Sequence, residues 1–136
     1  MRYLLDTNAV IAVLNDPAGA VSHRLRQNVP ADVGVSVVVM HELYCGAFKS
    51  RRREGNLVLL DALQFEVVPM DLEDARHAGE IRAMLAARGA PIGPCDILIA
   101  GQARARGLTL ISRNLREFAR VPGLCTENWE NGKTED

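Results

Sequence analysis

Residues 1–14 read MRYLLDTNAVIAVL, and this stretch decides how the rest of the chain is interpreted. The apolar run Tyr3 to Leu5 is typical of a buried strand, and it ends on the carboxylate of Asp6. Apolar residues then resume and predict a helix over Asn8 to Leu14. A strand buried on both faces is a rigid support, so Asp6 is either a helix cap or a residue held at a functional site.

The composition of the 136 residues is that of a globular domain. Hydrophobic residues make up 48% and charged residues 24%, while only 4% are aromatic, so the core should consist mostly of Leu, Val, Ile and Ala. The length favours a single domain. The net charge of -1 gives no general attraction to nucleic acid or to membranes, so an anionic partner must bind a local basic patch.

Three cysteines, Cys45, Cys95 and Cys125, form no CxxC pair, which favours reduced thiols over disulfides. Asp6 and Asn8 interrupt the first apolar stretch, so it does not read as a signal peptide. No apolar run approaches the roughly 18 residues that a membrane-spanning helix needs. We expect a cytoplasmic protein with no membrane association.

Strands are predicted to alternate with helices along the whole chain. Further strands are expected at Asp32 to Val35, Phe65 to Pro69 and Leu108 to Ile111. Helices are expected from Pro17 to about Gln27, after the N-cap Ser36, over Asn56 to Gln64, from Asp71 to Gly89, and from Cys95 to Gly107. This alternation predicts an α/β fold with a parallel sheet covered on both faces. Binding sites in such folds lie at the carboxyl ends of the strands.

The C-terminal stretch ENWENGKTED, residues 127–136, is polar, and we expect it to fray. We assign residues 1–130 to one domain and residues 131–136 to a polar tail.

Two further acids can meet Asp6 at the carboxyl edge of the sheet. Glu42 lies about two turns into the helix that begins at Ser36, and helical side chains lean toward the N-terminus of their helix. Asp96 lies in the first turn of a helix that ends at Gly107 and leads into a strand, so its start returns to the same edge. Asp6, Glu42 and Asp96 are therefore expected to converge.

Three carboxylates in one crevice repel each other unless a cation lies between them. Oxygen ligands suit Mg²⁺ or Mn²⁺ better than zinc, and such an ion can polarise a phosphate and activate a water. Each acid alone has a plainer interpretation: Asp6 can cap a helix, Glu42 can be solvated, and Asp96 can favour a helix N-terminus. The case for a metal site rests on their combination.

With these residues in place, the chain resembles the PIN-domain ribonucleases, and among them the VapC toxins of bacterial toxin–antitoxin pairs. The resemblance lies in YLLDTNAVI, in SVVVMHELYCGAFKS and in the block from Gly79 to Leu124. It implies a three-layer α/β/α sandwich with a parallel sheet of four to five strands. It also implies an Mg²⁺ site, with Mn²⁺ possible, in which Asp6 and Asp96 contact the ion most directly and Glu42 completes the cluster.

The chain departs from the family pattern at one position. Many PIN domains have a fourth acid after the last apolar strand, where this chain has Asn114. Glu117, three residues further on, could partly substitute for it, so the number of ions stays open. Asn8 and Ser112 are expected to be polar residues that support the ligands.

Arginines follow the last apolar strand directly. We predict that Arg113 and Arg116 contact an RNA backbone, whereas we expect Arg104 and Arg106 to lie on a solvated helix surface. The run KSRRR, residues 49–53, is equally consistent with a solvated turn and with an RNA contact, and it could also meet an acidic antitoxin segment.

The resemblance implies an endoribonuclease toxin that cleaves tRNA, with the anticodon stem-loop of initiator tRNA favoured, and so arrests translation. It also implies a VapB-type antitoxin whose C-terminal segment covers the active-site groove, binding of operator DNA only through that antitoxin, and a homodimer. Two alternatives remain. One is a non-catalytic PIN-fold module that binds RNA or antitoxin. The other is a phosphatase of the haloacid dehalogenase type, which needs a second Asp where this chain has Asn8.

Overall fold

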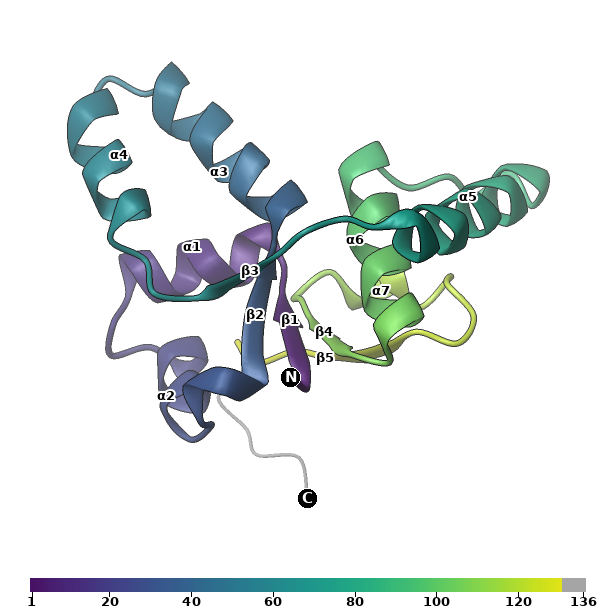
Figure 1. Ribbon diagram of the computed structural model, residues 1–136, viewed down its shortest axis with the longest axis horizontal. Coiled ribbons are helices and arrows are strands. Elements are labelled where there is room, and N and C mark those ends of the chain that lie inside the picture. The colour runs from purple at the N-terminus through teal and green to yellow at the C-terminus, as the bar shows by residue number, and fades with distance from the viewer. Residues whose placement is uncertain (131–136) are drawn as a thin grey trace.

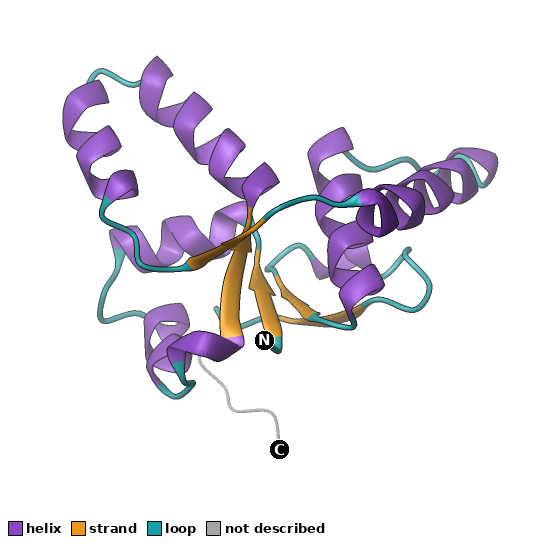
Figure 2. Ribbon diagram, in the orientation of Figure 1, coloured by secondary structure: helices purple, strands orange, loops and turns teal. Residues whose placement is uncertain are grey.

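Five short strands form the centre of the computed structural model, which describes residues 1–130 (Figures 1 and 2). The strands are β1 (Tyr3–Leu5), β2 (Val33–Ser36), β3 (Glu66–Val68), β4 (Thr109–Ile111) and β5 (Cys125–Glu127). All pair in parallel, in the order β3-β2-β1-β4-β5. Every residue of the central β1 is buried, as expected for an apolar strand covered on both faces.

Seven α-helices connect and cover the strands within the described part of the chain. They are α1 (Thr7–Asn15), α2 (Ala20–Arg26), α3 (Val37–Lys49), α4 (Arg53–Asp61), α5 (Leu72–Ala87), α6 (Pro94–Arg106) and α7 (Leu115–Phe118). In Figure 1, α1, α3 and α4 lie to one side of β1, and α5, α6 and α7 lie to the other. The predicted three-layer α/β/α sandwich with a parallel sheet is confirmed.

Local sequence signals explain where several helices begin and end. Asp6 caps α1 and Ser36 caps α3, each side chain accepting a backbone N–H of its own helix, at 2.8 and 3.1 Å. Asp71 and Asp74 form a reciprocal capping box at the start of α5. Gly107 ends α6 with φ at 66°, a left-handed conformation that glycine adopts without strain.

Two helices, α2 and α4, begin three residues away from their predicted starts. Pro17 does not open the second helix, because a turn closed by the Gly19 N–H on the Asp16 carbonyl comes first, and α2 begins at Ala20. The fourth helix begins at Arg53, three residues before its predicted start at Asn56.

The prediction that residues 127–136 fray is wrong for the part that the structure describes. Cys125–Glu127 pairs with β4 as a fifth strand, and Trp129 is only 1% exposed. The Trp129 ring packs edge-on against Tyr3, with ring centroids 5.1 Å apart. One large aromatic side chain therefore anchors a segment that is otherwise polar. Residues 131–136, the expected polar tail, lie outside the described residues.

The helices α5 and α6 pack against each other at very close range. Gly101 permits this approach, because a Cβ atom at this position would lie 2.6 Å from the backbone nitrogen of Ala78. A larger residue would therefore force the two helices apart.

Two arginines near the end of α6 bind α5, so the expectation that they lie on a solvated surface is wrong. The side chain of Arg104 is 12% exposed, donates to the His77 ring at 2.9 Å and forms an ion pair with Glu80. Arg106 donates to the buried carboxylate of Asp74 at 2.9 and 3.1 Å. Both arginines therefore hold two helices together.

Candidate active site

Asp6 directly follows β1 and is 5% exposed. Burial raises the pKa of Asp6, and the hydroxyl of Ser112 and the N–H of Ala9 oppose this shift without cancelling it. Ser112 follows β4, whose residue Ile111 lies opposite Leu5 in the sheet. The parallel register therefore brings Asp6 and Ser112 to the same strand edge, as the sequence predicted.

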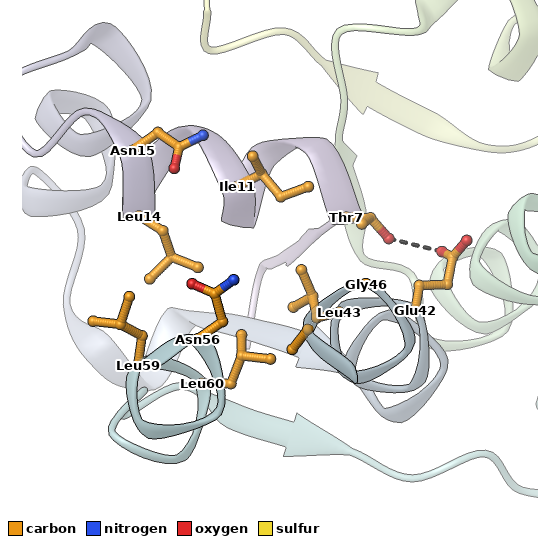
Figure 3. A pocket seen from close by; sticks show the side chains of 11 residues that line it. Thr7, Ile11, Leu14, Asn15, Glu42, Leu43, Gly46, Asn56, Leu59 and Leu60 are labelled. Carbon is orange, nitrogen blue, oxygen red and sulfur yellow. Dashed lines mark hydrogen bonds between the residues drawn. The ribbon is translucent and has the colours of Figure 1, made fainter. Parts of the chain in front are cut away.

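Glu42 reaches the same edge from the second turn of α3 and is half-buried. Its carboxylate accepts a hydrogen bond of 2.7 Å from the hydroxyl of Thr7, the first residue of α1 (Figure 3). Thr7 lies next to Asp6 in the chain, so this bond ties Glu42 to the end of β1. The sequence reasoning did not assign this role to Thr7, although Thr7 stands between Asp6 and Asn8 in the polar interruption of the first apolar run.

Asp96 lies in the first turn of α6 and is half-buried. The pKa of Asp96 is raised to about 6, first by burial and then by repulsion from the carboxylates of Glu42, Glu117 and Asp6. Repulsion between charges weakens as the distance between them grows. Four acids from four separate segments of the chain are therefore near enough for three of the charges to act on Asp96.

The helix α7 supplies the fourth of these acids. Asn114 stands where many PIN domains have an acid, and its backbone N–H donates to the Ser112 hydroxyl at 2.9 Å. Glu117 lies in the single turn that follows and repels Asp96. Asn8 is half-buried at the start of α1, and its side chain forms no hydrogen bond within residues 1–130.

A fifth carboxylate, from Glu130, was not anticipated. It follows the end of β5, its charge acts to raise the pKa of Asp6, and its Oε1 lies 3.9 Å from a guanidinium nitrogen of Arg113. Because β5 was not predicted, the residues after it were not assigned to the strand edge. Trp129 was the signal that could have revealed this strand.

The two arginines predicted to contact RNA flank this edge. Arg113 is near enough to Asp6 to act against the rise in its pKa, and its side chain is 60% exposed. Arg116 is exposed on α7. Both positions leave the guanidinium groups accessible to a phosphate backbone.

The chemistry of these donors suits a hard divalent cation. They are all carboxylate oxygens, and within residues 1–130 no basic side chain contributes to the pKa of Asp96. In the same residues, no three Asp, Glu, His or Cys side chains stand close enough to hold one ion together. The charges of Glu42, Glu117 and Asp6 nevertheless act on Asp96. Mg²⁺ tolerates such an arrangement, because it keeps several waters and binds through one or two carboxylates.

An apolar pocket opens beside Glu42, between α1, α3 and α4 (Figure 3). Its polar end is formed by Thr7 and Glu42, and the apolar side chains of Ile11 and Leu59, which are 39% and 55% exposed, line it further along. The acidic edge therefore continues into an apolar surface.

No helix within residues 1–130 combines the length and the apolar character needed to cross a membrane.

Comparison with known proteins reveals extensive similarity. The model of the PIN domain family matches residues 3–124. The chain is 40% identical over 131 residues to the tRNA(fMet)-specific endonuclease VapC of Shigella flexneri, covering 95% of this chain and 98% of the relative. It is 41% identical, with the same coverage, to Ribonuclease VapC2 of Haemophilus influenzae.

Solved structures give the same result. The DNA-bound VapBC complex from Salmonella typhimurium contains a chain that is 38% identical and superposes with a TM-score of 0.90, covering 95% of this chain and 98% of that one. VapBC-1 from nontypeable Haemophilus influenzae superposes with a TM-score of 0.85 at 29% identity and covers 95% and 98% of the two chains.

Proposed function

The chain belongs to the PIN-domain family and, within it, to the VapC ribonucleases, and from this premise we propose that it is a metal-dependent endoribonuclease acting as the toxin of a toxin–antitoxin pair. The observation that carries the proposal is the convergence of Asp6, Glu42, Asp96 and Glu117: burial and then repulsion from the other three carboxylates raise the pKa of Asp96 to about 6. Four acids that repel one another in a half-buried place favour the binding of a cation.

We assign the metal ligands to Asp6 and Asp96, with Glu42 completing the set and Glu117 adding the charge that Asn114 lacks. When bound, Mg²⁺ or Mn²⁺ would polarise the scissile phosphate and lower the pKa of an attacking water. Asp6 is oriented by the Ala9 N–H at 2.8 Å, and Glu42 by the Thr7 hydroxyl at 2.7 Å. These bonds hold the carboxylates in place before any ligand arrives.

The proposed substrate is tRNA, with the anticodon stem-loop of initiator tRNA favoured. This proposal is supported by the 40% identity to a relative named as a tRNA(fMet)-specific endonuclease, over 95% of this chain. Arg113 and Arg116 are exposed beside the acids, where they would bind phosphates on either side of the cleaved bond. Cleavage of this tRNA would arrest translation in the cytoplasm.

The proposed partner is a VapB-type antitoxin. Structural neighbours of this chain are VapBC complexes, some of them bound to DNA. A C-terminal antitoxin segment with apolar side chains would fill the pocket lined by Ile11 and Leu59 and cover Glu42 at its end. Operator DNA would then be bound through the antitoxin alone, and the toxin would form a homodimer.

Cleavage by purified variants tests the enzymatic proposal. Initiator tRNA and an elongator tRNA are incubated with the unaltered chain, with Asp96→Asn and with Glu73→Gln, a matched control that removes one exposed charge from α5. In Mg²⁺, we expect the unaltered chain and Glu73→Gln to cleave initiator tRNA faster than the elongator tRNA. Asp96→Asn should cleave neither. Equal cleavage by Asp96→Asn, or cleavage in excess chelator, would refute the metal mechanism. Binding of tRNA by all three without cleavage would indicate a non-catalytic module.

A further inference from the structure

The turn between α3 and α4 carries a basic surface that the proposed active site does not use. We call it the basic tip and define it by Phe48, Lys49, Arg51, Arg52 and Arg53, all of which are exposed. None of its four cations forms a salt bridge within residues 1–130. The whole chain has a net charge of -1, so this is a local concentration of positive charge.

Hydrogen bonds hold the backbone of the basic tip in one conformation. The Ser50 hydroxyl donates to the Ala47 carbonyl at 2.8 Å and accepts from the Asn56 amide at 3.0 Å. Arg53 donates to the Phe48 carbonyl at 3.0 Å and so closes the end of α3. A surface that is ordered before binding loses little entropy when a partner arrives.

The basic tip is aligned with the proposed active site along one face of α3. Lys49 follows Glu42 by seven residues, which places it on the same helix face about 10 Å away. Cys45 and Gly46 lie between them on this face, and a Cβ atom at Gly46 would meet nothing within 4 Å. Figure 1 shows α3 and α4 extending together from the sheet, with their connection at the far end. An extended single strand of RNA could therefore run along α3 from Glu42 to the basic tip without meeting a bulky side chain on this face.

Phe48 gives the basic tip an apolar component. It is 52% exposed, and it is the only aromatic side chain among the large exposed hydrophobics of the described residues. An aromatic ring among cations is the combination that binds single-stranded nucleic acid, because the ring stacks on a base while the cations contact phosphates. An acidic protein segment without apolar side chains would pair with the arginines but would leave the Phe48 ring without a partner.

We propose that the basic tip is a second RNA-contact surface, which binds phosphates of the substrate through Lys49, Arg51 and Arg52 and stacks one unpaired base on Phe48. This inference rests on the proposed RNA cleavage and adds to it a preference for a strand that is single-stranded between the cleaved bond and the tip. Contacts at the tip would favour a loop over a continuous duplex.

Binding measurements in a non-cleaving background test the arginines. In the Asp96→Asn chain, Arg51→Gln/Arg52→Gln is compared with the matched control Arg82→Gln/Arg88→Gln, which removes two exposed arginines from the α5 region. Fluorescence anisotropy with a labelled RNA hairpin is recorded at several salt concentrations. We expect the tip variant to bind roughly tenfold more weakly, with a salt slope smaller by about 1.4, the value for two lost single-strand contacts. The control should change less than twofold.

Substitutions of Phe48 test the stacking contact in the same assay. Phe48→Leu keeps an apolar side chain without a ring face and should weaken binding of the hairpin roughly tenfold. Phe48→Tyr keeps the ring and should restore binding. Circular dichroism verifies that the variants keep the fold.

Three outcomes discriminate between the explanations. Equal binding by the tip and control variants would overturn the inference. Unchanged RNA binding together with lost antitoxin binding would also overturn it, since the tip would then belong to the antitoxin interface. If the unaltered chain cleaves no RNA in Mg²⁺ while the tip variants still lose hairpin binding selectively, the proposed enzymatic function fails and the tip inference stands.

Discussion

Asp6 and Asp74 are two buried aspartates at helix starts, yet their surroundings shift their acidity in opposite directions. Asp6 is 5% exposed, and its pKa is raised by burial against the weaker effects of Ser112 and Ala9. Asp74 is 1% exposed, and burial acts to raise its pKa as well, but the hydrogen bonds and charge of Arg106, together with hydrogen bonds from Asp71 and Gln102, outweigh burial and lower it. A buried carboxylate with a cation supplied by the fold stabilises the fold. A buried carboxylate without one favours the binding of a cation from outside.

The pairing of Asp74 also explains why α6 carries both kinds of site. Its C-terminal residue Arg106 binds Asp74 of α5, while its first turn presents Asp96 to three other acids. The same helix is therefore fixed at one end and left with excess negative charge at the other.

The largest expected effect is on catalysis, from Asp6→Asn. The variant should cleave RNA about a thousandfold more slowly, because the proposed ion would lose a ligand and stabilise the transition state less. Its free energy of unfolding should not fall, since a buried charge is removed and an amide oxygen can still cap α1. Single-turnover cleavage and urea denaturation measure the two quantities. If Asp6→Asn is inactive only because it is unfolded, Asp6 serves the stability of the fold as Asp74 does, and the distinction between the two aspartates is wrong.

The second effect is on stability, from Asp74→Asn. Removing the carboxylate leaves Arg106 without its main partner, and we expect the free energy of unfolding to fall by about 3 kcal/mol. Urea denaturation at pH 7 measures the loss, with Glu73→Gln as an exposed control on the same helix. The folded fraction should retain its cleavage activity. An unchanged stability would show that the ion pair does not hold α5 and α6 together.

The third effect is the response to Mg²⁺. At a concentration ten times its dissociation constant, a bound ion should stabilise the unaltered chain by about 1.4 kcal/mol, which corresponds to a rise of about 5 °C in melting temperature for a domain of this size. Asp74→Asn should have a lower melting temperature without Mg²⁺ but should show the same rise when Mg²⁺ is added. Asp6→Asn should show no such rise. Thermal melts with and without chelator provide the measurement. An equal shift in both variants would place the ion elsewhere.

The smallest effect is on the pH dependence of stability. The pKa of Asp96 is raised to about 6 in the folded state. As the pH falls, the folded state therefore takes up a proton at a higher pH than the unfolded state does. Stability should therefore rise as the pH falls from about 7 toward 4. The pKa of Asp74 is lowered in the folded state. The carboxylate of Asp74 therefore contributes fully to the stability of the fold above about pH 4, and this contribution is lost as the pH falls further.

The variant Asp96→Asn tests the part of this pH dependence between about pH 7 and pH 4, which is assigned to Asp96. It should be more stable than the unaltered chain at pH 7.5 by less than about 1 kcal/mol, because Asp96 is only partly buried and solvent screens its repulsion. The difference should vanish near pH 4. A variant that is less stable than the unaltered chain at pH 7.5 would show that Asp96 is not under repulsive strain from its neighbours.

The sequence predicted those parts of the fold and site that depend on local signals or on sheet geometry. The caps at Asp6 and Ser36 and the stop at Gly107 are encoded within one helix turn. The approach of Asp96 to Asp6 follows from the rule that parallel strands share a carboxyl edge. The roles assigned to these residues in metal binding remain predictions.

Other features depend on contacts between distant residues and could not be predicted. Arg106 and Asp74 are 32 residues apart, and nothing in either local sequence marks the other as its partner. β5 has only three residues, and Trp129, which anchors it, follows in a polar stretch. The bond from Thr7 to Glu42 joins two helices whose relative position is set by packing.

The close approach at Gly101 has a mechanical consequence for Asp96. The backbones of α5 and α6 approach closely at Gly101 and Ala78, and Arg106 binds Asp74. We therefore expect the two helices to move together as one rigid unit. Asp96 stands five residues from Gly101, so any force that a ligand exerts on it is borne by two helices at once. The carboxylate of Glu42 accepts a hydrogen bond from Thr7 at the same edge, but its side chain is one methylene longer than that of Asp96 and has more ways to rotate. Adjustment to ligands of different size should therefore come from Glu42, with Asp96 as the fixed reference.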